Sequence, residues 1–278
     1  MFTNKRYRAG YDRERGIREK KMHNDIFTIG KFTIHGYGLM IAIGVIVAVL
    51  VAIYRAKKAG IDPEVVLDLV LIGLICGFGG GKILYLIVEW KDFIKSPMTY
   101  LGGGGFVVYG GIILAMIVGA VYFTLKKKDP LIVMDLIMPE VSIAQGFGRI
   151  GCFLAGCCYG RITDSVFGVV FPEGSLAPAG VKLIPTQLIM SAGNFLIAGI
   201  LLIAATKLKK RGQILSLYLI LYAVGRFAVE FLRNDHRGAV GVFSTSQFIS
   251  LFIVIIGIGL FVWSTIGIKF GIKEEPKA

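Results

Sequence analysis

Charged residues are scarce in this sequence. Only 18% of the 278 residues are Asp, Glu, Lys or Arg, and 55% are hydrophobic, whereas a soluble globular domain carries about 25% charged residues. The mean hydropathy of +0.72 agrees with this. These values exclude a soluble globular domain and indicate a polytopic membrane protein. The net charge of +13 does not indicate a nucleic-acid partner, because the basic residues gather in short loops between apolar runs, where they act as topology signals.

Cysteine and histidine are also few. The four cysteines, Cys76, Cys152, Cys157 and Cys158, lie inside or at the edge of apolar segments, so they predict no disulfide framework. Inert packing is the favoured interpretation. A redox or nucleophilic thiol near an arginine stays open for the last three. A metal site is favoured least, because soft structural sites usually take four ligands and the three histidines are remote in sequence.

Three common patterns are missing. Residues 1–21 hold eight basic and three acidic residues, a net charge of +5, but no apolar core, so they are not a signal peptide. They are expected to be a disordered basic extension, or a translated stretch upstream of a true start at Met22. The glycine-rich segments lack the preceding strand and the following Gly-Lys-Ser/Thr of a phosphate-binding loop. No inverted duplication is visible, which disfavours a transporter.

Seven apolar segments follow this extension, each near the ~20 residues needed to cross a ~30 Å hydrocarbon core. Only helices satisfy every backbone polar group within such a segment. The predicted fold is therefore all-α, with seven transmembrane helices in a single domain at residues 22–278. The expected spans are residues 37–54, 65–88, 106–125, 131–157, 186–206, 214–232 and 248–268.

Basic residues follow the first, third, fifth and seventh segments. Positively charged loops stay in the cytoplasm, so this pattern predicts an N-terminus outside and a cytoplasmic C-terminus. A monomer is expected, because the polar residues can be collected within one bundle.

Ionisable side chains within the predicted spans are costly, at about 2.5 to 3.5 kcal/mol each on insertion scales. They are expected to line a shared polar interior. Arg149 and Arg226 favour a functional role, because a guanidinium binds phosphate with two parallel hydrogen bonds and stays charged when desolvated. Glu230 lies four residues after Arg226, where the two side chains can pair on one helix face. For Asp68, Asp135 and Glu140, a functional role and an ion pair that joins two helices are equally favoured. Lys82 is the last of the seven ionisable residues within the predicted spans.

Glycines gather at the start of the third span. Gly102 to Gly105 precede a segment that contains Tyr109, Gly110 and Gly111. Such glycines allow a bulky ligand to approach the backbone, and they equally allow close packing of two helices. The glycines alone leave both interpretations open.

Several short motifs occur in a fixed order along the chain. They are IHGYGLM at 34–40, YGG at 109–111, GRIGCF at 148–153 followed by GR at 160–161, PTQ at 185–187, GRF at 225–227 and VEFLR at 229–233. Together they resemble the successive motifs of the bacterial prolipoprotein diacylglyceryl transferases, from about residue 27 to the C-terminus. That family also has seven spans and an outward N-terminus.

The resemblance implies a multi-pass transferase of the bacterial cytoplasmic membrane. Such enzymes move the diacylglyceryl group of phosphatidylglycerol to the lipobox cysteine thiol of secreted preproteins, forming a thioether and releasing glycerol phosphate. The resemblance assigns headgroup binding to Arg149 and neutralisation of the leaving phosphate to Arg226, with Glu230 orienting Arg226. It implies no metal or cofactor. The donor pocket would be completed by Tyr37, Gly110, Gly111, Cys152 and Gly160.

The chain also departs from the family pattern. Tyr109 stands where the family usually has a histidine that could deprotonate the acceptor thiol, and tyrosine titrates at about 10 whereas histidine titrates at about 6.5. Cys152 stands where asparagine is usual, and Cys157-Cys158-Tyr159 replaces a segment containing glutamate. Tyr109 is therefore a weak candidate for the catalytic base. The alternatives are the same transfer with another means of thiol activation, a paralogue with a different acceptor and, less favoured, a transporter or a scaffold.

Overall fold

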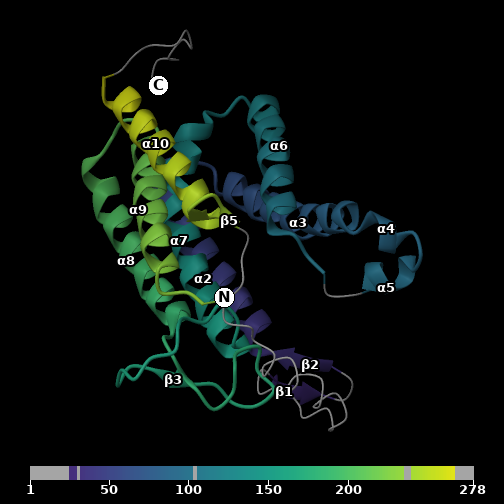
Figure 1. Cartoon of the computed structure of the whole chain (residues 1–278). Coiled ribbons are helices and arrows are strands. Elements are labelled where there is room, and N and C mark those ends of the chain that lie inside the picture. The colour runs from purple at the N-terminus through teal and green to yellow at the C-terminus, as the bar shows by residue number, and fades with distance from the viewer. Residues whose placement is uncertain (1–24, 30–31, 103–104, 235–238, 267–278) are drawn as a thin grey trace.

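The computed structural model describes residues 25–29, 32–102, 105–234 and 239–266 (Figure 1). The basic extension at residues 1–21 lies outside these residues, so its predicted boundary stays a prediction. Seven of the described helices are long and apolar enough to cross a membrane, which confirms the predicted fold class. They are α2 (Gly36–Lys58), α3 (Pro63–Val88), α6 (Val108–Lys126), α7 (Pro130–Ala155), α8 (Thr186–Lys207), α9 (Gln213–Glu230) and α10 (Thr245–Ile266).

Local sequence signals explain where these helices begin and end. The Asp62 carboxylate accepts a hydrogen bond from Glu64 N at 3.0 Å, and α3 begins with a proline, which needs no donor partner in the first turn. Asp129 caps the start of α7 in the same way. Gly156, at φ +70°, ends α7 two residues before the predicted end of this span, because its left-handed backbone stops the helix.

The shorter elements lie in the connections. Two short helices, α4 (Trp90–Phe93) and α5 (Pro97–Gly102), follow α3. Three antiparallel strand pairs, which the all-α prediction did not include, are too short to change the fold class. They are β1 (Asp25–Ile29) with β2 (Phe32–His35), β3 (Val169–Val170) with β4 (Lys182–Leu183), and β5 (Ala239–Val240) with β6 (Phe243–Ser244).

Helix α7 is the centre of the bundle. It packs on α2, α8 and α9, while α10 packs on α9, and α3 pairs with α6 at the side of the bundle (Figure 1). One buried apolar cluster joins α7, α8 and α9 through Met138, Leu201 and Tyr218. Hydroxyl groups also cross between helices, since Ser142 Oγ donates to Asn194 O at 2.8 Å and Ser191 Oγ donates to Gly146 O at 2.9 Å.

The basic connections meet at one end of the bundle. Arg211, between α8 and α9, forms an ion pair with Asp129 at the start of α7, with Nη1 and Oδ2 2.9 Å apart. Lys210 Nζ donates to Thr265 O near the end of α10 at 2.6 Å. The connections after α6 and α8 and the last turn of α10 therefore lie together, as the charge pattern requires if they share one side of a membrane.

The acidic residues Asp68, Asp135 and Glu140 join helices. Asp68 accepts a hydrogen bond from Tyr122 on α6, and Asp135 accepts from the backbone N–H groups of Gly212 and Leu215 at the start of α9. Of the two interpretations left open by the sequence, these contacts support helix-to-helix pairing.

Glu140 is the most deeply buried of the three. Its Oε1 lies 2.6 Å from Arg55 Nη1 of α2, and the same nitrogen donates to Leu136 O at 2.5 Å. Pro139 interrupts the backbone hydrogen bonding of this turn, because proline has no N–H. Arg55 thus joins α2 to α7 at the turn that contains Pro139.

The glycines of α3 and α6 allow their backbones to touch. A Cβ added to Gly80 would lie 2.5 Å from Gly110 O, and one added to Gly111 would overlap Gly77 O. Gly110 and Gly111 are both buried in this contact. Of the two interpretations of this segment, close helix packing is the one that the contacts support.

Candidate active site

The candidate site lies at the end of the bundle where α2, α8 and α10 begin and α7 and α9 end (Figure 1). Tyr37 lies in the first turn of α2 and packs on the last turns of α7. A Cβ on Gly151 would lie 3.1 Å from Tyr37 Cδ2. The Arg149 guanidinium, on the same part of α7, interacts electrostatically with Tyr37 and Cys152. The structure thus brings together three residues that the sequence analysis assigned to the donor pocket.

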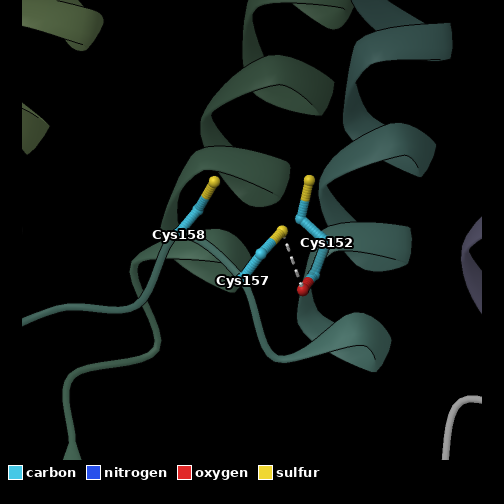
Figure 2. Close-up of side chains that lie close together, drawn as sticks. All are labelled: Cys152, Cys157 and Cys158. Atoms are coloured by element: carbon cyan, nitrogen blue, oxygen red, sulfur yellow. Dashed lines mark hydrogen bonds between the residues drawn. The ribbon is translucent and has the colours of Figure 1, made fainter. Parts of the chain in front are cut away.

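The chain turns back on itself directly after α7. Cys157 N donates to Cys152 O at 3.1 Å, and Cys157 Sγ lies 3.6 Å from the same oxygen (Figure 2). Cys158 takes a left-handed conformation, with φ +63°, which is uncommon for a residue other than glycine. The three sulfur atoms of Cys152, Cys157 and Cys158 all lie within 4.8 Å of one another. A set of three thiols this close could hold a metal ion.

The turn that contains Cys157 and Cys158, called the cysteine turn below, is bound by the first turn of α8. Gln187 Nε2 donates to Cys157 O at 2.6 Å, and Thr186 Oγ1 donates to Cys158 O at 2.7 Å. Both side chains are fully buried. Among the described residues, Gln187 Oε1 has no hydrogen-bond partner, which leaves a buried acceptor beside the cysteines.

The residues that follow α9 pair with the backbone just after Cys158. Gly160 pairs with Arg233 as an isolated β-bridge, and Arg161 N donates to Leu232 O at 2.9 Å. A Cβ on Gly160 would lie 2.7 Å from Ile184 O, so glycine is required for this close approach of two backbones. Gly160 therefore has a packing role, and its predicted contact with substrate stays a prediction.

Arg233 is buried beside the cysteine turn, with only 6% of its surface exposed. Its Nη1 lies 4.0 Å from Met190 Sδ, and its guanidinium also hydrogen-bonds the Cys158 thiol. Hydrogen bonds from the Cys152 and Cys157 thiols lower the pKa of the Cys158 thiol below its usual range, and Arg233 acts in the same direction.

Arg226 and Glu230 form the predicted ion pair. Arg226 Nη1 donates to Glu230 Oε2 one turn later on α9, which confirms the pairing expected from their spacing. Arg226 Nη2 donates to Ser246 Oγ, at the start of α10, at 2.6 Å. The side chains of Arg226 and Glu230 are only 10% and 8% exposed. This guanidinium is therefore fixed by contacts from two helices.

Tyr109 is placed differently from the other predicted residues. It lies in the first turn of α6, which packs on α3, and its side chain is 50% exposed. Within the described part of the chain, its hydroxyl makes no hydrogen bond, and no contact joins it to Arg149 or Arg226. Its predicted catalytic role and the predicted substrate contacts of Gly110 and Gly111 stay predictions.

An apolar groove of about 410 Å³ lies along the first turns of α10. One wall is the segment 241–243, and the other is a face of α10. It is lined by Gly241, Val242, Phe243, Phe248, Leu251, Phe252 and Ile255. An apolar groove of this kind can accommodate acyl chains.

Comparison with known proteins decides the family. Residues 24–263 match the family model described as prolipoprotein diacylglyceryl transferase. The chain belongs to this family. The match covers all seven apolar helices except the last residues of α10, and it confirms the resemblance inferred from the ordered motifs.

Curated relatives cover most of the chain. A phosphatidylglycerol–prolipoprotein diacylglyceryl transferase of Clostridium tetani is 48% identical over 239 residues, which are 85% of this chain and 95% of the relative. A protein of Clostridium perfringens with the same name and the number 2 is 48% identical over 231 residues, 82% of this chain and 90% of the relative. One from Clostridioides difficile is 33% identical over 251 residues, 90% of this chain and 98% of the relative.

Two residues of the candidate site were missed by sequence reasoning about function. Ser246 is one of several serines near the start of the last apolar segment, and nothing in its spacing points to Arg226. Arg233 was quoted in a motif, but its neighbour Cys158 lies 75 positions earlier in the chain. Only the folded backbone, through the Gly160–Arg233 bridge, brings these positions together.

Proposed function

We propose that this chain transfers the diacylglyceryl group of phosphatidylglycerol to the thiol of a lipobox cysteine in secreted preproteins. The products are a thioether and glycerol phosphate. The family match and the names of the Clostridium tetani and Clostridium perfringens relatives support this proposal. The observation that carries it is the Arg226 guanidinium, fixed by Glu230 and Ser246 at one end of an apolar bundle.

The chemistry explains why a fixed guanidinium is needed. When the bond between the glyceryl carbon and the phosphate oxygen breaks, the phosphate leaves with additional negative charge. Preorganised cations or donors aimed at such a charge are usually the largest catalytic contribution. Arg226 would neutralise the leaving phosphate, and Glu230 and Ser246 would keep it oriented so that no reorganisation is needed during the reaction.

Arg149 supplies a second cation for the donor. In this proposal it binds the phosphatidylglycerol headgroup, with Tyr37 and Cys152 beside it. A guanidinium suits this task because it remains charged in apolar surroundings and offers parallel N–H donors.

The acyl chains of the donor would lie in the groove formed by 241–243 and α10. The groove is apolar and runs along α10, the helix whose Ser246 contacts Arg226. The acyl chains of a lipid whose phosphate is at Arg226 would then lie against the same helix, α10. Phe252→Asp, on the wall of the groove, is expected to raise the KM for long-chain phosphatidylglycerol more than the KM for a short-chain analogue.

We further propose that the chain functions as a monomer in the bacterial cytoplasmic membrane, with its N-terminus outside. The grouping of Lys210, Arg211 and Lys126 to Lys128 at one end supports this orientation, because such loops stay cytoplasmic. The site then faces outward, where secreted preproteins emerge. A green fluorescent protein fused to the C-terminus is expected to fluoresce, since it folds in the cytoplasm, and a dark fusion that is fully expressed would contradict the orientation.

The deciding experiment uses purified protein in lipid nanodiscs that contain phosphatidylglycerol with a radiolabelled diacylglyceryl group. A lipobox peptide is expected to gain the label, and the same peptide with serine in place of cysteine is not. Arg226→Ala is expected to lower the rate of transfer by a factor of about 10² or more. Arg211→Ala is the matched control, because it also removes an arginine that forms an ion pair, but at the opposite end of the bundle. Folded protein that transfers nothing from phosphatidylglycerol would exclude this function.

A further inference from the structure

The sulfur atoms of Cys152, Cys157 and Cys158 point to the same side of the turn that follows α7 (Figure 2). Each lies within 4.8 Å of the other two. A tetrahedral zinc ion, with Zn–S bonds of about 2.3 Å, holds its sulfur ligands about 3.8 Å apart. Side-chain rotations that move each sulfur by about 1 Å or less would therefore place all three on one ion.

The backbone under these sulfurs is already fixed. Gly156 and Cys158 take left-handed conformations that form the turn, and Thr186 and Gln187 of α8 hold the carbonyl groups of Cys158 and Cys157. Metal sites need ligands held by such surrounding hydrogen bonds, because otherwise ordering the ligands would cost part of the binding energy. The cysteine turn meets this requirement without any rearrangement of the main chain.

The charges around the turn suit a metal bound by thiolates. Three thiolates and one divalent ion carry a net charge of −1, which must be compensated when it is partly buried. Arg149 interacts electrostatically with Cys152, and the buried Arg233 hydrogen-bonds Cys158. Two guanidinium groups, which stay charged in any surroundings, therefore border the cluster.

We propose that Cys152, Cys157 and Cys158 bind one zinc ion, whose fourth coordination position takes the thiol of the acceptor cysteine. This inference rests on the transfer reaction proposed above. Thiolate ligands select soft or borderline ions, and zinc sites with three protein ligands keep a fourth position for water or substrate. The site would activate the acceptor thiol in place of Tyr109, because a thiol bound to zinc loses its proton and becomes the nucleophile.

The transfer step balances without an oxidant or reductant. The acceptor thiol replaces a water on zinc and releases its proton to solvent. Its sulfur then forms a bond to the terminal glyceryl carbon of the donor, while the bond from that carbon to the phosphate oxygen breaks and its electron pair leaves with the phosphate. The products are a thioether, which binds zinc more weakly than a thiolate does and so dissociates, and glycerol phosphate.

The first test measures metal binding directly. The full chain, purified without a polyhistidine tag, is stripped with a chelator and titrated with Zn²⁺, and bound zinc is counted by mass spectrometry. One zinc per chain is expected for the parent, and a loss of binding of about tenfold or more for Cys152→Ala, Cys157→Ala and Cys158→Ala. Cys76→Ala is the matched control, because this cysteine is buried in α3 away from the turn. Zinc binding that is absent from the parent, or unchanged in all three variants, would overturn the proposal.

The second test asks whether the acceptor thiol enters the metal site. Co²⁺ in place of zinc gives visible absorption bands typical of tetrahedral sites and a sulfur-to-cobalt charge-transfer band in the near ultraviolet. Adding the lipobox peptide is expected to increase the charge-transfer band by about one third, as three sulfur ligands become four. The peptide with serine in place of cysteine should leave it unchanged. An identical spectrum with both peptides would overturn the fourth-ligand assignment, whatever the transfer activity.

The third test uses the folded parent and needs no variant. Chelation is expected to lower the transfer rate about tenfold or more, because a free thiol with a pKa near 8.5 is only about 3% thiolate at pH 7. Added Zn²⁺ should restore the rate. Full activity without zinc would overturn the proposal while leaving the proposed function intact. Normal zinc binding with no transfer from phosphatidylglycerol would exclude the proposed function instead, so the two failures are distinguishable.

Discussion

Arg226 on α9 and Ser246 on α10 are joined by a hydrogen bond of 2.6 Å, while the other terminal nitrogen of the same guanidinium bonds Glu230. One contact comes from the same helix and the other from its neighbour. The orientation of the guanidinium plane is thus fixed by contacts on two of its nitrogens, whereas an ion pair along a single helix would fix only one. Any shift of α10 against α9 would also move the group that we propose to receive the leaving phosphate.

Arg226→Lys is expected to retain folding but to lose transfer, because an ammonium group cannot keep both contacts and still present two parallel donors to a phosphate. Removing a group that stabilises transition-state charge lowers kcat by a factor of about 10² to 10³, and Arg226→Ala should lower kcat by at least this much. Ser246→Ala removes only the orienting contact, so a loss of about tenfold in kcat/KM is expected. Steady-state transfer to a lipobox peptide measures all three. Activity of the lysine variant close to that of the parent would contradict the assignment of Arg226.

Tyr109→Phe is expected to keep most of the transfer activity. The phenol lies half exposed in the first turn of α6 and, among the described residues, makes no hydrogen bond. Removing its hydroxyl therefore takes away no contact that the structure shows. The check is the pH profile of kcat/KM for the variant beside the parent. A loss of about 10² or more, typical of a missing general base, would restore the sequence-based prediction that Tyr109 acts on the acceptor thiol.

Gly80→Ala is expected to destabilise the pair of α3 and α6 by about 1 to 3 kcal/mol, because the new methyl group would lie 2.5 Å from Gly110 O and force the two backbones apart. Gly79→Ala is the matched control on the same helix. A Cβ there meets no described atom within 4 Å, so the change should be neutral or stabilise the helix by up to about 1 kcal/mol. Unfolding in mixed detergent measures both. Equal stability of the two variants would exclude close packing as the reason for Gly80.

The fold could be predicted because membrane solvation acts on each segment separately. The length and hydropathy of the segments beginning near Tyr37 and Thr186 determined the two spans within a few residues, since any non-helical backbone there would leave polar groups unpaired in lipid. The same local reasoning anticipated the pairing of Arg226 with Glu230, because four residues make one helical turn.

The composition of the site could not be predicted as well, because its parts come from distant segments. Cys158 and Arg233 meet only through the backbone pairing at Gly160, and Ser246 meets Arg226 only because α10 packs on α9. Nothing in the spacing of Cys152, Cys157 and Cys158 shows that Gly156 turns the chain back and brings the sulfurs together. Tyr109 was placed by its position in a motif, and motif order carries no distance between α6 and α7.

Glu140→Ala is expected to destabilise the bundle by about 3 to 5 kcal/mol, because it leaves the partly buried Arg55 charge without its carboxylate. Glu140→Gln should cost less, since the amide oxygen can still accept from Arg55. Asp92→Ala is the control, because its ion pair with Lys95 is exposed and should contribute nothing measurable. The midpoint of unfolding in mixed detergent measures the three variants. Glu140 joins α2 to α7 at a distance from the candidate site, so the transfer rate per folded molecule should stay near that of the parent. A variant that keeps full stability but loses transfer activity would instead show that Glu140 takes part in the reaction.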